Sequence, residues 1–84
     1  MAAVTYSVVL TFVRDEAGDL VAEEGVEAPN AHTAQRRAQA ASLTKAGAIA
    51  FNRTGDPMLG EFEDAVVIAS FGDVPTDLAG FVGG

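Results

Sequence analysis

Apolar and polar side chains alternate along the first part of the chain, between residues 4 and 14 (VTYSVVLTFVR). Because successive side chains of a strand point to opposite faces, this alternation predicts a half-buried β-strand. Residues 15–19 (DEAGD) supply turn residues, and Gly18 can adopt the positive φ that a tight turn needs. The alternating apolar positions are Val4, Tyr6, Val8, Leu10 and Phe12.

A second alternating segment follows at residues 19–28. Glu24 interrupts its apolar alternation, and Gly25 beside it indicates a bulge or a strand edge. We therefore predict a hairpin whose second strand is exposed to solvent on one face. The apolar face is assigned Leu20, Ala22, Val26 and Ala28, and the polar face is assigned Glu23 and Glu27.

Residues 31–46 predict a helix, because they are rich in Ala, Gln, Arg and Leu, which are strong helix formers. Asn30 is suited to cap the first turn, since its side chain can accept from a free backbone N–H. Gly47 is suited to follow the last turn. Leu43 lies almost opposite an alanine stripe, at a position that packing within one chain does not explain. The stripe consists of Ala31, Ala34, Ala38 and Ala41.

Two further strands are predicted over residues 48–54 (AIAFNRT) and 64–71 (DAVVIASF). The order is then β-β-α-β-β, an α+β fold of two layers in which a four-stranded antiparallel sheet carries one helix on one face. We expect a single domain over residues 1–84, with an ordered core at about 4–72 and a partly flexible tail at 73–84.

Both faces of the predicted sheet carry apolar side chains, because Val9 and Val13 point away from the face of Leu10 and Phe12. One alanine-lined helix cannot cover both faces. The chain has 84 residues and no cysteine, so its core is small and no disulfide can stabilise it. Self-association is a common alternative in small domains. We therefore predict a homo-oligomer, as a dimer, that acts through protein–protein contacts.

The net charge is −7 at neutral pH, and acids and bases are segregated along the chain. Residues 15–29 carry six acids and no base, whereas residues 30–54 carry four bases and no acid. A mostly acidic surface repels nucleic-acid phosphates, so we expect no nucleic-acid partner. No apolar run approaches the roughly 20 residues of a membrane helix, and the N-terminal segment does not resemble a signal peptide. We expect a cytoplasmic protein without membrane contact.

The segment 53–64 (RTGDPMLGEFED) is the strongest candidate for a small-ligand or cation-binding loop. Its weak candidate metal ligands are Asp56, Glu61 and Glu63. Their spacing does not match a calcium-binding loop, and the glycines are not followed by the lysine of a phosphate-binding loop. We favour a structural interpretation, in which the segment turns the chain and Met58 and Leu59 anchor it. No metal site and no cofactor is predicted.

No set of residues forms a catalytic motif. His32 has no evident activating partner, and no serine lies in a nucleophile motif, so we predict no catalytic residue and no enzyme. Arg36 and Arg37 are expected to pair with the acids of residues 19–28 or with those of a neighbouring subunit. The predicted partner contacts are Arg36, Arg37, Leu43, Leu78 and Phe81.

Two resemblances add alternatives. The string at residues 45–75 (KAGAIAFNRTGDPMLGEFEDAVVIASFGDVP) looks like small uncharacterised bacterial proteins, some of them prophage-associated, which carry no assigned function. The string at residues 28–40 (APNAHTAQRRAQA) is similar to the helix of HicB-type antitoxins, which follows a hairpin in a partial ββαβ fold. That resemblance implies an antitoxin-like protein with a small basic partner.

Overall fold

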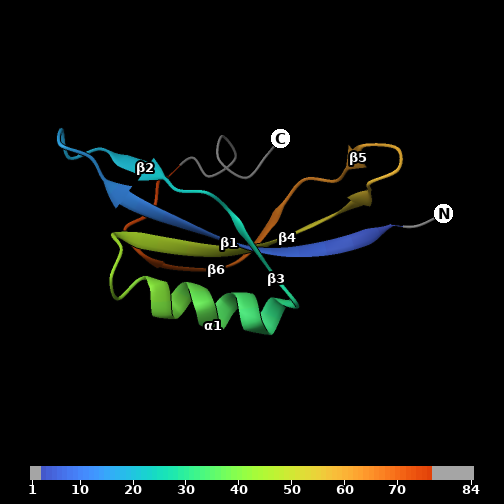
Figure 1. Ribbon diagram of the computed structural model, residues 1–84, viewed down its shortest axis with the longest axis horizontal. Helices are drawn as coiled ribbons and strands as arrows, with labels where there is room; N and C mark the ends of the chain where they lie inside the picture. Colours follow the sequence, from blue (N-terminus) through green and yellow to red (C-terminus); the bar gives the residue numbers. More distant parts are fainter. Residues whose placement is uncertain (1–2, 77–84) are drawn as a thin grey trace.

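The computed structural model describes residues 3–76, in which a single α-helix lies against a curled antiparallel sheet (Figure 1). The fold class is α+β, as predicted. No helix in this part of the chain is long and apolar enough to cross a membrane. The elements in chain order are β1 (Val4–Arg14), β2 (Leu20–Ala22), β3 (Val26–Ala28), α1 (Ala31–Ala41), β4 (Gly47–Asp56), β5 (Glu61–Phe62) and β6 (Val66–Gly72).

The two long strands β1 and β4 form the centre of the sheet and pair antiparallel from Val4 opposite Gly55 to Phe12 opposite Gly47. Two short strands, β2 and β3, pair with the outer side of β1. On the outer side of β4 lie β5 and β6. β2 and β3 divide the segment 19–28, which was predicted as one strand, and β5 lies in the segment predicted as the connection before the last strand. The sheet therefore has six strands instead of four.

Buried side chains form a separate cluster on each face of the sheet. On the face that packs against α1, which we name the helix face, the cluster consists of Val9, Ala28, Ala34, Ala38, Ala48 and Ala50. On the opposite side, which we name the far face, it consists of Leu10, Phe12, Ile49 and Phe51. The predicted alanine stripe is confirmed, because Ala34 and Ala38 are completely buried against the sheet.

The segment between β2 and β3 holds one extra residue relative to β1. Phe12 pairs with Ala22 and Ser7 pairs with Ala28, so five steps along β1 face six steps along the neighbouring segment. An offset of one residue turns the following side chains to the other face. Leu20 and Ala22 therefore pack on the far face, whereas Ala28 packs on the helix face. The predicted bulge is present, but the prediction that one face carries all these apolar residues is wrong.

The far face is covered within one chain. Phe12 and Ile49 are completely buried, and Leu10 and Phe51 are only 7% exposed. The described side chains that pack against them are Val8, Leu20, Ala22, Ala65 and Val74. This face therefore does not need a second copy to cover it, contrary to the prediction. The error in the prediction is the strand parity, because the bulge directs β2 towards the face that α1 leaves open.

The helix begins as predicted and ends early. Asn30 accepts a hydrogen bond of 2.8 Å from the backbone N–H of Thr33, which is the predicted N-cap. The last helical residue is Ala41, and Gly47 begins β4 instead of following the helix. The Ser42 hydroxyl donates to a backbone carbonyl one turn earlier, at 2.7 Å. This hydroxyl thus satisfies one of the carbonyls that have no partner within the helix at its C-terminal end.

Candidate functional site

The turn after β4 is held by hydrogen bonds to Asp56. Its backbone carbonyl accepts from Leu59 at 3.1 Å and from Gly60 at 2.9 Å. Its side-chain Oδ1 accepts from the backbone N–H of Met58 at 2.9 Å. The Asp56 carboxylate thus stabilises the turn, as aspartates commonly do. The structural interpretation of the segment 53–64 is confirmed for this residue.

Phe62 fastens the returning strand onto β4. It pairs with Gly55, where an added Cβ would lie 2.4 Å from a ring carbon of Phe62, so only glycine allows this approach. The Phe62 ring lies 6.2 Å from that of Tyr6, and the Arg53 guanidinium carbon lies 5.2 Å from the Phe62 centroid. Arg53 Nε is buried without a hydrogen-bond partner, so its main contact is the ring face.

Met58 and Leu59 do not anchor the turn. Met58 is 88% exposed and Leu59 is 68% exposed. The turn lies at the end of the sheet where β4 ends, away from α1 (Figure 1), and no helix or strand of residues 3–76 covers these two side chains. The predicted anchoring role is therefore wrong, and two large apolar side chains are left in contact with solvent.

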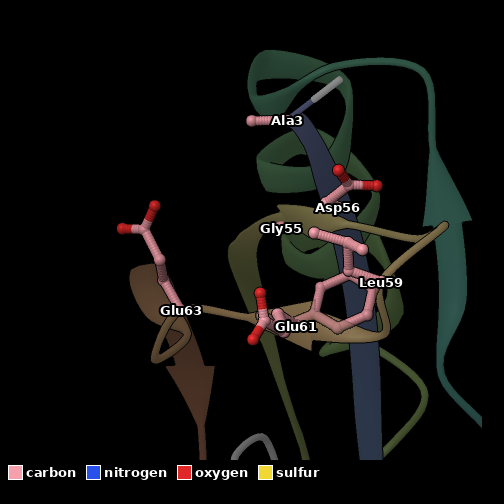
Figure 2. A pocket seen from close by; sticks show the side chains of 7 residues that line it. Ala3, Gly55, Asp56, Leu59, Glu61 and Glu63 are labelled. Carbon is pink, nitrogen blue, oxygen red and sulfur yellow. The ribbon is translucent and has the colours of Figure 1, made fainter. Parts of the chain in front are cut away.

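A cavity of about 320 Å³, which we name the hairpin pocket, lies beside this turn (Figure 2). Leu59 and Phe62 give it an apolar part, and Figure 2 shows the carboxylates of Asp56, Glu61 and Glu63 pointing in different directions around it. Within residues 3–76, no group of three or more His, Cys, Asp or Glu residues could hold a metal ion. The residues that line the pocket are Ala3, Gly55, Asp56, Leu59, Glu61, Phe62 and Glu63.

The predicted partner contacts on the helix are exposed. Arg36 and Arg37 line a second cavity of about 320 Å³ with Thr33 and Ala40, which we name the helix cleft. Leu43, just beyond the end of α1, is 84% exposed. The other two predicted contacts, Leu78 and Phe81, lie outside the described residues.

Arg36 and Arg37 do not pair with the acids of residues 19–28 in this chain, so that part of the prediction is wrong. Lys45 takes this position, with its Nζ 3.1 Å from Glu23. The Thr11 hydroxyl donates to the same carboxylate at 2.7 Å. The Thr11 hydrogen bond first, and then the contact with Lys45, hold the pKa of Glu23 below its ordinary value.

Strand β6 forms an exposed and uncharged edge, which sequence reasoning missed as a site. Its sequence VVIASFG contains no charged residue, and Val66 and Val67 are 62% and 38% exposed. Among the strands of residues 3–76, none pairs with its outer side. Ile68 is an extra residue opposite β4, which makes a small bulge in the edge. The signal in the sequence is the run of seven residues without Lys, Pro or an acid.

No protein family, no curated protein and no solved structure matches the chain. The resemblances to small bacterial proteins and to HicB-type antitoxins therefore stay predictions. Three surfaces of the molecule are candidates for a functional contact: the β6 edge, the helix cleft and the hairpin pocket.

Proposed function

We propose that the chain is a non-enzymatic, cytoplasmic protein that acts through protein–protein contacts and forms a homodimer by joining the outer edges of β6. The observation that carries the proposal is the uncharged outer edge of β6 with its exposed valines. In this proposal, β2 and β3 together occupy one strand position beside β1, and β5 and β6 together occupy one beside β4. Counted in this way, the chain has the predicted two-layer β-β-α-β-β layout.

The chemistry of a strand edge supports this contact. An edge strand presents a row of backbone N–H and C=O groups that another strand can pair with. Each backbone hydrogen bond formed contributes a net stabilisation of about 0.5–1.5 kcal/mol. Val66 and Val67 would lose contact with water in the same step, which adds an apolar contribution.

The charge distribution permits a second copy at this edge. Two copies of net charge −7 repel each other unless few unpaired acids meet at the contact. Residues 66–72 contain no acid, and of the two flanking acids, Asp64 and Asp73, the second is already paired with Arg14. A two-fold axis through the edge would pair β6 antiparallel with its own copy, which is the commonest symmetry of oligomers.

A charge placed on the edge tests the proposal. Ser70 is exposed and lies in the middle of the uncharged stretch, so Ser70→Lys adds a cation where two copies would meet. Ser70→Thr is the matched control, because threonine is uncharged and favoured in strands. We expect sedimentation velocity at micromolar concentration to give dimers for the wild type and for Ser70→Thr, and monomers for Ser70→Lys in high salt.

Two outcomes contradict the proposal. A wild-type chain that sediments as a monomer throughout the accessible concentration range would refute self-association. A Ser70→Lys variant that stays dimeric in high salt, with an unchanged circular dichroism spectrum, would show that copies join elsewhere than at β6.

A further inference from the structure

The five basic residues of the chain fall into two groups. Arg14 pairs with Asp73 at 3.2 Å, Lys45 pairs with Glu23, and Arg53 lies against the Phe62 ring. Arg36 and Arg37 have no ion pair or hydrogen bond within residues 3–76, and both are exposed. These two arginines are therefore the only cations left for a partner in the part of the chain that the structure describes.

Arg36 lies on the outer side of α1. It follows the buried Ala34 by two positions, which in a helix of 3.6 residues per turn places it on nearly the opposite side. Leu43 comes two positions after Ala41, the last helical residue, and it is 84% exposed. The helix and the turn that follows it thus present two free guanidinium groups and one free apolar side chain.

The hairpin pocket has the complementary character. Glu61 and Glu63 make no ion pair within residues 3–76, and both are exposed. Beside them, Leu59 and Phe62 are 68% and 40% exposed. The pocket thus combines free carboxylates with free apolar side chains.

These two surfaces cannot meet within one chain. Figure 1 shows the hairpin that carries β5 at the far end of the sheet from α1. We propose that Arg36 and Arg37 of one copy bind in the hairpin pocket of a second copy, with Leu43 against Leu59. A planar guanidinium can donate two parallel hydrogen bonds to a carboxylate, and its apolar stem can cover the Phe62 ring.

This contact depends on the proposed function only in requiring that copies associate, because it uses surfaces other than the β6 edge. Because it joins two different surfaces, it links copies head to tail. If a two-fold axis relates two copies, the same contact forms twice between them. Exposed ion pairs are screened by salt, whereas a strand-edge contact between uncharged residues is not. Salt therefore separates the two contacts.

The experiment uses the full chain carrying Ser70→Lys, so that the β6 contact is removed. In this background, Arg36→Gln with Arg37→Gln neutralises the helix cleft. The matched control is Gln35→Glu with Gln39→Glu, which changes the net charge of the same helix by the same amount. Asp56 is left unchanged because its carboxylate holds the turn. Sedimentation velocity is measured in low and in high salt.

We expect the background to associate in low salt and to dissociate in high salt. Neutralising the two arginines should weaken this association at least about tenfold, which corresponds to about 1.4 kcal/mol, while the matched control leaves it within about threefold. Charge reversal gives the sharper result. Arg36→Glu with Arg37→Glu and Glu61→Arg with Glu63→Arg should each dissociate alone, and a mixture of the two variants should associate again.

Three outcomes overturn the inference. The first is a neutralised helix that associates as well as its matched control. The second is a pair of reversed variants that stays monomeric when mixed. The third is a mixture that stays monomeric while an arginine-rich synthetic peptide shifts the amide resonances of Glu61 and Glu63, which assigns the pocket to a different basic protein. If the chain without Ser70→Lys still dimerises in high salt in these cases, the proposed β6 contact stands and only this inference fails.

Discussion

The two edges of the sheet pair antiparallel with a long central strand, β1 or β4, and present opposite surfaces to the solvent. The β2–β3 edge belongs to a segment, residues 19–28, with four acids, an extra residue and Gly25, and Pro29 follows it. The β6 edge has no charge over seven residues. Charges, bulges and proline are the devices by which proteins prevent edge-to-edge pairing. Because β6 also contains a small bulge, the main difference between the two edges is charge: the β2–β3 edge carries acids that disfavour pairing with another chain, and the β6 edge carries none.

The difference shows that the negative charge of this protein is concentrated in particular segments and is not spread evenly over the surface. If net charge alone decided association, both edges would repel a second copy equally. The acids gather beside β2 and β3 and around the β5 turn, and they leave β6 uncharged. Changes that exchange the character of the two edges should therefore alter association in opposite directions, while changes to the strands themselves should alter stability.

Deletion of Glu24 should have the largest effect. It removes the extra residue, so β2 and β3 can no longer direct Leu20 to the far face and Ala28 to the helix face together. We expect the free energy of unfolding to fall by about 2–4 kcal/mol, mainly from loss of the Leu20 contacts. Urea unfolding followed by circular dichroism measures it. Glu24→Ala, which keeps the length, should change stability by less than about 0.5 kcal/mol; equal effects would mean that the bulge is not needed.

A matched pair of glycine substitutions should give the next largest difference between the two edges. At Gly47 an added Cβ would lie 1.9 Å from the carbonyl oxygen of Asp73, so Gly47→Ala must push the end of β6 away from β4. At Gly25 the nearest atom is a Val8 methyl at 3.2 Å, which can shift. We expect a loss of about 1–3 kcal/mol for Gly47→Ala and below about 0.5 kcal/mol for Gly25→Ala. Thermal unfolding of both variants compares them.

Removing protection from the β3 edge should have a smaller effect on association. Glu27 lies in the middle of β3, and Glu27→Thr replaces its charge with a residue that favours strands. We expect light scattering to show species larger than the wild-type oligomer. Glu16→Thr in the turn before β2 is the charge-matched control, and it should behave like the wild type. If both variants enlarge the assembly equally, net charge and not the edge governs association.

The smallest effect should come from Glu23. Because its folded pKa is lowered by Thr11 and Lys45, the charged form stabilises the fold above the ordinary glutamate pKa of about 4.3. That stabilisation is lost as pH falls through the lowered pKa. Glu23→Gln should therefore lower the melting temperature near neutral pH, and the difference from wild type should vanish in acid. Glu24→Gln is the control. A difference that is constant with pH would contradict the assignment.

The sequence predicts the elements well and their faces less well. The period-two positions of residues 4–14 form β1, Gly18 takes a positive φ of 85° in its turn, and the alanine stripe of α1 is buried. These features depend on local geometry and on patterns of period two or 3.6. Glu24 and Gly25 revealed the bulge, but the parity change follows only from the pairing of both short strands with β1, which is not a local property.

The candidate site was predictable in its parts and not in its arrangement. A turn was correctly predicted within the segment 53–64, but only residues 57–60 form it, because β4 continues to Asp56 and β5 begins at Glu61. Arg36, Arg37 and Leu43 are exposed. The exposure of Met58 and Leu59 was not predictable, because an apolar residue is buried only if another element can reach it. The role of Phe62 depends on Tyr6 and Arg53, which come from two other positions in the chain and meet only in the folded sheet.

The two clusters of the core are sensitive to opposite changes in side-chain volume. On the helix face the contacts are made by alanine methyls, so Ala34, Ala38 and Ala48 leave no space for a larger residue. On the far face Phe12 and Ile49 fill their space, so a smaller residue leaves a void. Substitutions in this chain are therefore limited in two ways: side chains on the helix face cannot become larger, and side chains on the far face cannot become smaller. The sheet keeps its position only while neither limit is crossed.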